Sequence, residues 1–398
     1  MNREGQNASG PLAGVRILDL TRLLPGPMCT LYLADLGADV VKVEDTGAGD
    51  YARDLDAQPG TVSPFYRMVN RNKRSLAIDL KQPRGRDAFL ALVHGADALV
   101  EGFRPGVMAS LGLAFETLHR MRPQLVYASL SGYGQTGPRA ARAGHDINYL
   151  GYAGVLDQTG TQGDPPALSN LQVADLLGGA ATTAVGILAA LIGAMRSGRG
   201  RYVDVSMTDS ALAHNIFALH ALEARGHTEE RGMDLLTGGV PCYGVYQTQD
   251  GRWLAVGALE EKFWRLLCVT LGRDDLVPGR LARGEDGERV RNELATIFRS
   301  APLATWLHRF ADVDACVTPV ATLREALADP QFAARDMIVN RPDGSHQYAP
   351  PLRMSDHLFE VTRDAPRQGE HSVEILAEAG LPRATIERLI ADRVVRVS

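Results

Sequence analysis

Short apolar runs alternate with longer amphipathic runs through the first half of the chain. The apolar runs predict strands at 15–21, 39–44, 75–80, 96–103, 125–132 and 202–206. Helices are predicted between and after them at 27–38, 83–95, 173–196 and 209–224. Short apolar strands separated by helices indicate a parallel sheet that is covered on both faces. Ligands of such sheets bind beyond the carboxyl ends of the strands.

The pattern changes after a polar stretch at 225–231, which is typical of a linker. Strands are predicted at 242–248 and 252–257, joined by a loop that contains the hairpin signal Asp250-Gly251. Helices are then predicted at 260–271, 288–299 and 303–310, followed by a strand at 315–320 and tail helices at 372–379 and 383–391. The chain is therefore expected to be α/β, with a parallel sheet in its larger part and a smaller α+β domain after it.

The predicted helix at 173–196 contains an uncharged run, 176–195, that is long enough to cross a membrane. The run is rich in Ala and Gly, and no second candidate of this kind accompanies it. A helix that is apolar on every side is also typical of the buried core of a large protein. We expect the buried helix and no membrane.

Composition adds limits on partners and location. The chain has 398 residues, 45% of them hydrophobic, and a formal net charge of -5, whereas nucleic-acid binders are usually basic. Its four cysteines are scattered, with no CxxC pair, which indicates a reducing compartment and no disulfide framework. The polar first ten residues lack the apolar run of a signal peptide. We expect a cytoplasmic protein that binds no nucleic acid.

Several catalytic signatures are missing: there is no GxxxxGK[ST], HExxH or GxSxG. One GxGxxG lies at 132–137, directly after a predicted strand. A dinucleotide site needs that motif to open a helix, so that the pyrophosphate meets the helix N-terminus. Pro138 and a basic loop follow instead, so a glycine-rich turn is the favoured interpretation.

Two acid–base candidates lie at or before the start of the long helix. Asp175 lies at its start, where a carboxylate can simply cap the helix. Gly178 and Gly179 follow within about one turn and suggest that something large approaches this helix end closely. His145 follows the basic loop, and histidine is the natural acid–base group near neutral pH, although many histidines are only surface or core residues.

Basic residues lie near the ends of two predicted strands. Arg71, Lys73 and Arg74 directly precede the strand at 75–80, and Arg104 follows the strand at 96–103. Lys and Arg at strand ends of one sheet can collect phosphate groups. Each is equally compatible with a solvated surface charge.

Longer segments resemble one known family nearly from end to end. These segments are 23–27 (LLPGP), 33–44 (LADLGADVVKVE), 72–75 (NKRS), 131–138 (SGYGQTGP), 198–200 (GRG), 203–205 (VDV) and 369–372 (GEHS). Together they identify the chain as a member of the class III coenzyme A transferase superfamily, also called the CaiB/BaiF family.

Within this superfamily the chain is most similar to the α-methylacyl-CoA racemase branch. The motifs that carry this resemblance are 144–150 (GHDINYL), 170–175 (NLQVAD) with 178–179 (GG), 255–260 (AVGALE) and 314–320 (DACVTPV). The resemblance implies that His145 and Asp175 form an acid–base pair and that Glu260 orients the histidine. It also implies coenzyme A contacts at Leu23, Asn72, Lys73, Arg74, Phe103, Arg104, Gly144 and Tyr149.

The resemblance further implies an architecture and a ligand. A large Rossmann-like domain is expected from 1–224 and 331–398, with a small α+β domain at 225–330 between them. Two chains are expected to interlock as a homodimer, with each active site between the large domain of one and the small domain of the other. Acyl-CoA is expected as the substrate, with no permanently bound cofactor and no metal.

Two reactions fit these residues. A racemase removes and returns the α-proton of a 2-methylacyl-CoA through an enolate. A transferase of this family instead uses the aspartate, here Asp175, as a nucleophile that moves coenzyme A between carboxylic acids. His145, and only two consecutive glycines at 238–239, favour the racemase.

Other positions favour the transferase or leave the choice open. Thr237 stands where racemases usually carry aspartate, the loop at 47–53 resembles the transferase version, and Asp45 stands where several relatives place arginine. A non-catalytic acyl-CoA-binding protein is a further alternative. The joint presence of His145, Asp175 and Glu260 speaks against it.

Overall fold

The computed structural model describes residues 10–58 and 61–398, and its chain groups into two compact units. The first unit consists of Met1–Ala153, Leu171–His214 and Asp336–Ser398, and the second of Gly154–Asn170 and Asn215–Arg335. Residues 1–9, which hold most of the polar stretch used to predict a cytoplasmic location, lie outside the described part.

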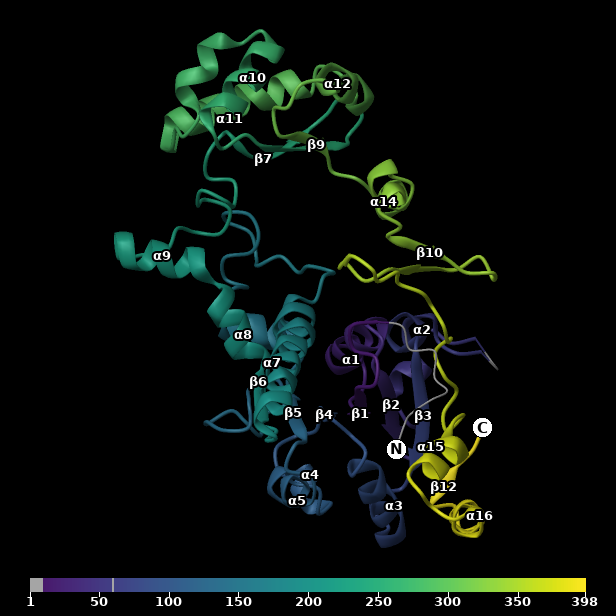
Figure 1. Ribbon diagram of the computed structural model, residues 1–398. Coiled ribbons are helices and arrows are strands. Elements are labelled where there is room, and N and C mark those ends of the chain that lie inside the picture. Colours follow the sequence, from purple (N-terminus) through teal and green to yellow (C-terminus); the bar gives the residue numbers. More distant parts are fainter. Residues whose placement is uncertain (1–9, 59–60) are drawn as a thin grey trace. The chain divides into compact units, whose positions relative to one another are not determined.

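A seven-stranded sheet forms the centre of the first unit, with the order β12-β3-β2-β1-β4-β5-β6 (Figure 1). Its strands are β1 (Arg16–Leu20), β2 (Asp39–Glu44), β3 (Lys73–Ile78), β4 (Ala98–Glu101), β5 (Val126–Ser131), β6 (Tyr202–Ser206) and β12 (Val395–Arg396). All neighbours pair in parallel except the edge strand β12, which runs antiparallel to β3. The order 3-2-1-4-5-6 is that of doubly wound dinucleotide-binding sheets, whose direction of winding reverses between β1 and β4.

Helices cover both faces of this sheet, as the continuous apolar strands predict. On one face, α1 (Pro25–Asp35) and α7 (Thr182–Ser197) pack against Ile17, Val40 and Val100 of the strands. On the other face, α3 (Pro83–Val93), α15 (Ser372–Glu378) and α16 (Arg383–Ala391) pack against Leu18 and Val41, which adjoin Ile17 and Val40 in the strands. The remaining elements of this unit are η1 (Tyr51–Arg53), α2 (Pro64–Asn70), α4 (Val107–Ser110), α5 (Phe115–Met121), α6 (Asp146–Tyr152), η2 (Ala174–Ala181), α8 (Met207–His214), β10 (Ile338–Asn340) and β11 (His346–Tyr348).

The long apolar helix runs from η2, a π-helix, directly into α7. Within the described residues it is the one helix with the length and apolarity of a membrane span. Of its most apolar 18-residue stretch, 44% is buried. Ala184, Ile187 and Leu191 lie in the core, whereas Val185 and Met195 are exposed. The helix that the sequence predicts as buried is therefore buried on one face and exposed on the other. Core helices of soluble proteins meet the same length and hydropathy criteria, so this single helix is weak evidence of a membrane.

The helix predicted at 209–224 is two helices in the structure. It breaks at Asn215, whose ψ of 49° is not helical, and divides into α8 and α9 (Ile216–Arg225). The break coincides with the change from the first unit to the second.

The second unit contains a three-stranded antiparallel sheet, β7 (Tyr243–Gln247), β8 (Trp253–Gly257) and β9 (Val317–Pro319). The hairpin between β7 and β8 turns at the predicted Asp250-Gly251. The other elements are α9, α10 (Glu261–Leu271), η3 (Asp274–Gly279), α11 (Gly284–Phe298), α12 (Leu303–Phe310), α13 (Leu323–Leu327) and α14 (Pro330–Ala334). Trp264 of α10 is fully buried in its core and donates to the carbonyl of Val277 at 3.0 Å.

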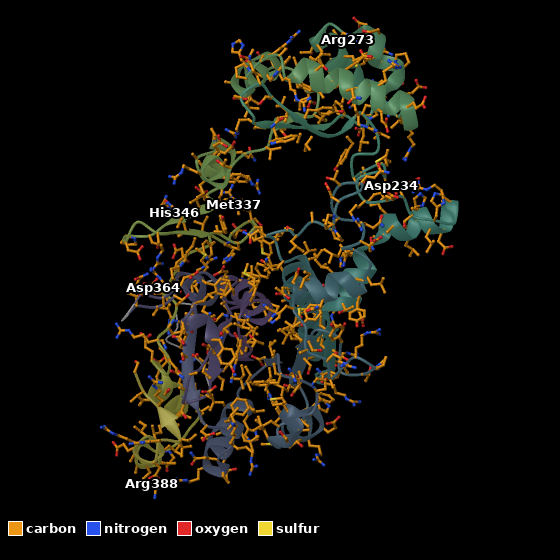
Figure 2. The ribbon with its side chains drawn as sticks, turned by 180° about the vertical axis from the view of Figure 1, so that it is seen from behind. Asp234, Arg273, Met337, His346, Asp364 and Arg388 are labelled. Atoms are coloured by element: carbon orange, nitrogen blue, oxygen red, sulfur yellow. The ribbon has the colours of Figure 1, made fainter. Side chains whose placement is uncertain are left out.

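Residues 154–170 belong to this second unit, although the sequence predicts them in the large domain. Arg231 explains the grouping, because its guanidinium donates to the carbonyl oxygens of Asp157 at 3.0 Å and Asp164 at 2.8 Å. Nearby, Asp234 (Figure 2) accepts from Arg225 at 2.8 Å.

Candidate functional site

The two acid–base candidates lie at the starts of two neighbouring helices of the first unit. His145 directly precedes α6, and Asp175 is the second residue of η2. The carboxylate of Asp146 joins the two helices, because its Oδ1 accepts the backbone N–H of Asp175 at 3.0 Å. His145 is also close enough for its charge to act on the Asp175 carboxyl. The structure thus brings together the pair that the sequence proposes.

The loop before α6 has an extended backbone at His145, with φ −129° and ψ 176°. The His145 N–H donates to the Asn148 side chain at 3.0 Å, which closes the first turn of α6. The backbone of His145 is therefore held in one conformation, and its side chain is exposed at the start of the helix. The first N–H groups of a helix have no partner within the helix, so such groups are expected next to His145.

The glycine pair after Asp175 packs against the chain's own helices. A Cβ on Gly178 would lie 3.0 Å from the carbonyl oxygen of Met207, and one on Gly179 would lie 2.8 Å from a side-chain carbon of Pro25. The close approach that these glycines predict is therefore that of α8 and α1. Asp175 is also carried on a π-helix, a form that is frequent at functional sites.

Electrostatics make Asp175 an unusually strong base for a carboxylate. Burial is the main cause that raises its pKa, to about 6, and the negative charge of Asp146 raises it further, while His145 opposes the rise. An acid–base group transfers protons most efficiently when its pKa lies near the working pH. Asp146 was not among the predicted site residues, although its place directly after His145 in the 144–150 motif was a signal.

A second group of predicted residues lies where the sheet reverses its winding, after the carboxyl ends of β1 and β4. Leu23 is 40% exposed and adopts a left-handed φ of 63°, held by its N–H donating to Asp50 at 2.9 Å. Asp50 in turn pairs with Lys42 at 2.8 Å, and both side chains are fully buried. A buried ion pair therefore fixes an exposed leucine at the ligand edge of the sheet.

The loop after β4 faces the same edge. The Phe103 N–H donates to Glu101 at 2.8 Å, and the following Arg104 is exposed. The Arg22 guanidinium, which sequence reasoning missed, lies 5.6 Å from the centre of the Phe103 ring and pairs with Asp45 at 2.8 Å. The aspartate at position 45 thus has a partner of its own chain.

Three of the predicted coenzyme A contacts are engaged elsewhere. Lys73 is fully buried and donates to the carbonyl of Pro27 at 2.8 Å and to Asp19 at 3.2 Å. Arg74, 2% exposed, pairs with Asp39, Glu374 and Glu378, each at 2.8 Å. The structure therefore contradicts the prediction that these two cations contact phosphates.

Asn72 is the third of these residues. Its side-chain oxygen accepts the N–H groups of Thr362 and Arg363 at 2.9 and 3.2 Å, and its amide donates to Asp35 at 2.9 Å. Asn72 therefore ties the C-terminal segment to the sheet, and its contact with coenzyme A stays a prediction.

Tyr149 also differs from expectation, because it is only 6% exposed. Its hydroxyl donates to the carbonyl of Gly144 at 2.5 Å, so the tyrosine packs against the loop that carries His145. Gly144 itself is half-buried in that loop.

Glu260 lies in the second unit, at the exposed residue before α10. Its orienting role toward His145 stays a prediction. The GxGxxG at 132–137 forms turns with no helix behind it, and the N–H of Gln135 donates to the Asp204 carboxylate at 3.1 Å. The interpretation of this motif as a glycine-rich turn is confirmed.

The comparisons with known proteins agree on one family. The model of CoA-transferase family III matches residues 12–372. The alpha-methylacyl-CoA racemase of Homo sapiens is 37% identical over 387 residues, which are 96% of this chain and 97% of the relative. The succinyl-CoA:glutarate CoA-transferase of Homo sapiens is 31% identical over 381 residues, 92% of this chain and 86% of the relative.

A solved structure agrees as well. The crystal structure of a CAIB/BAIF family protein from Brucella suis has a TM-score of 0.81 and 29% identity, and the match covers 93% of this chain and 99% of that one. The doubly wound sheet and these matches define an α/β enzyme of the CoA-transferase class. The chain belongs to CoA-transferase family III.

Proposed function

We propose that this enzyme epimerises the 2-methyl centre of 2-methylacyl-CoA thioesters. The observation that carries the proposal is the placement of His145 and Asp175 at adjoining helix starts, with the pKa of Asp175 raised to about 6. A thioester acidifies the proton on its α-carbon, so a group of this basicity can remove that proton. The name of the human racemase, which matches over 96% of this chain, supports the same reaction.

Epimerisation needs two groups that transfer protons and one hydrogen-bond donor for the enolate oxygen. One of His145 and Asp175 removes the α-proton from one face, and the other returns a proton to the opposite face. Between these steps the substrate is an enolate, whose oxygen needs a hydrogen-bond donor. The N–H groups of Asp175 and Leu176 already donate to Asp146 and Gln172. We therefore assign this donor to the backbone N–H groups at the start of α6, beside His145.

Coenzyme A is proposed to enter as part of the substrate and not as a resident cofactor. Leu23, Phe103 and Arg104 lie after the carboxyl ends of β1 and β4, the edge at which doubly wound sheets bind ligands. Exposed Arg104 is the group proposed to contact a phosphate. Gly144, in the loop of His145, is proposed to contact the part of the substrate nearest the thioester.

A homodimer of interlocked chains is proposed as the working form, located in the cytoplasm. Each unit exposes apolar side chains that a second copy would cover, Val185, Ile192, Met195 and Leu212 in the first and Ile216, Phe217, Leu219 and Leu222 in the second. Groups of large exposed apolar side chains are typical of interaction sites. In the dimer, Glu260 is proposed to reach His145 from the partner chain. A mass of one 42.9 kDa chain by light scattering would contradict this assembly.

The transferase remains the second candidate, because CoA-transferases are also found among the relatives at 31% identity. In that reaction Asp175 attacks the acyl-CoA carbonyl and displaces the coenzyme A thiolate, which gives an acyl anhydride. The thiolate then attacks the aspartyl carbonyl, forms an enzyme-bound thioester and releases the donor carboxylate. An acceptor carboxylate attacks this thioester and displaces the thiolate, which takes the acceptor's acyl group from the new anhydride and frees Asp175. The test that separates the two reactions is α-proton exchange in deuterium oxide without an acceptor acid. Only the racemase predicts this exchange.

A further inference from the structure

The peptide group that joins Gly144 to His145 is held on both of its polar sides by α6. The Tyr149 hydroxyl donates to the Gly144 carbonyl at 2.5 Å. The His145 N–H of the same peptide donates to the Asn148 side-chain oxygen at 3.0 Å. A planar peptide fixed at its oxygen and at its N–H cannot turn without losing one of the two bonds. The direction in which His145 leaves the backbone is therefore set by two side chains that follow it in sequence.

The tyrosine ring reaches this position because two glycines leave room for it. A Cβ on Gly132 would lie 2.4 Å from the ring, and one on Gly144 would lie 2.7 Å from it. Tyr133 packs edge-on against the same ring, with the ring centres 5.3 Å apart. The first glycine of the 132–137 turn thus serves the packing of Tyr149 beneath the histidine loop.

The hydroxyl stays a donor over the working pH range. Burial raises the pKa of Tyr149 to about 12, and the negative charge of Asp175 adds to the rise. Tyr149 therefore lies close enough to the acid–base pair to feel its charge, yet its hydroxyl is committed to Gly144.

We propose that Tyr149 is a positioning residue for His145, and that it acts with Asn148 as a clamp on the Gly144–His145 peptide. The proposal rests on the proposed function, because positioning matters only where His145 transfers a proton. Reacting groups must be held within a fraction of an ångström, since a misplacement of 1 Å can cost about a hundredfold in rate. The clamp acts on the histidine backbone and makes no contact with the substrate.

The test compares Tyr149→Phe and Asn148→Ala with the matched control Tyr152→Phe. Tyr152 is a second tyrosine of α6, and it is exposed and packs against Arg139. Two quantities are measured: kcat and KM for α-deuterium exchange, and the pH titration of the His145 imidazole by NMR, assigned by its loss in His145→Gln. We expect both clamp variants to lower kcat by about tenfold or more with KM changed less than about twofold. We also expect both to change the imidazole titration, and the control to match the unmodified protein.

Unchanged turnover and titration in Tyr149→Phe would overturn the clamp. A loss of turnover with an unchanged titration would also overturn it, because the hydroxyl would then act on the substrate. If the unmodified protein shows no exchange, the proposed function fails, and the imidazole titration alone decides on the clamp.

Discussion

The Asp146 carboxylate accepts the backbone N–H of Asp175 at 3.0 Å, so the residue after the histidine caps the helix that carries the aspartate. This bond brings a negative charge beside Asp175, and that charge helps to raise its pKa to about 6. Asp146 therefore links the two halves of the acid–base pair both by structure and by charge.

Removing this charge should make Asp175 easier to ionise. In Asp146→Asn the amide oxygen can still accept the Asp175 N–H, while the negative charge is gone. We expect the acidic limb of the pH profile of α-proton exchange, set near pH 6 by Asp175, to move to lower pH. Initial rates between pH 4.5 and 8 measure the shift. A limb that stays in place or moves upward would contradict the assigned role of Asp146.

The raised pKa of Asp175 also predicts an effect on stability. Ionised Asp175 costs stability in the folded protein, because its pKa of about 6 lies above its ordinary value of 3.8. This cost is fully present above pH 6 and disappears as the pH falls below the ordinary value. We expect Asp175→Asn to unfold at a higher temperature than the unmodified protein at pH 8, with the difference shrinking toward pH 4.5. A difference that grows toward low pH would contradict the direction of the shift.

Arg104 should contribute to affinity for coenzyme A. It is exposed after the carboxyl end of β4, so Arg104→Ala is expected to weaken acyl-CoA binding by about tenfold through loss of a charge-assisted phosphate contact. Calorimetric titration with a non-reactive acyl-CoA analogue measures the change. Arg120→Ala, an exposed arginine of α5, is the matched control and should bind as before. If both variants bind the acyl-CoA analogue with equal affinity, Arg104 does not contact coenzyme A.

Lys73 should act on stability, because it is buried against Asp19. Lys73→Met leaves that fully buried carboxylate without its nearest cation, a loss that costs about 3–5 kcal/mol in comparable pairs. Urea unfolding measures the difference, and Lys81→Met on the surface should change stability by less than about 0.5 kcal/mol. A Lys73 variant as stable as the Lys81 variant would show that the buried pair contributes nothing.

The strands and most helices could be predicted because apolar periodicity depends on the burial of each segment's own residues. The roles of Lys73 and Arg74 could not, because their partners come from distant parts of the chain. Arg74, for example, binds Glu374, 300 positions away. A sequence that places cations at a strand start does not reveal whether carboxylates will surround them.

The candidate site also has a part that the sequence predicted and a part that depends on distant residues. His145 and Asp175 were identified from motifs, and the structure places them at adjoining helix starts. The burial of Tyr149 was not predictable, because it depends on the space above Gly132, a residue of a different turn. The break at Asn215 was missed as well, since the apolar pattern continues through it.

The most direct test of the proposed reaction is incubation of the enzyme with a 2-methylacyl-CoA in deuterium oxide, without any acceptor acid. We predict incorporation of deuterium at the α-carbon together with loss of stereochemical purity, and no incorporation with His145→Ala. Absence of exchange, combined with transfer of coenzyme A to an added carboxylic acid and trapping of Asp175 by hydroxylamine, would contradict the racemase and establish the transferase.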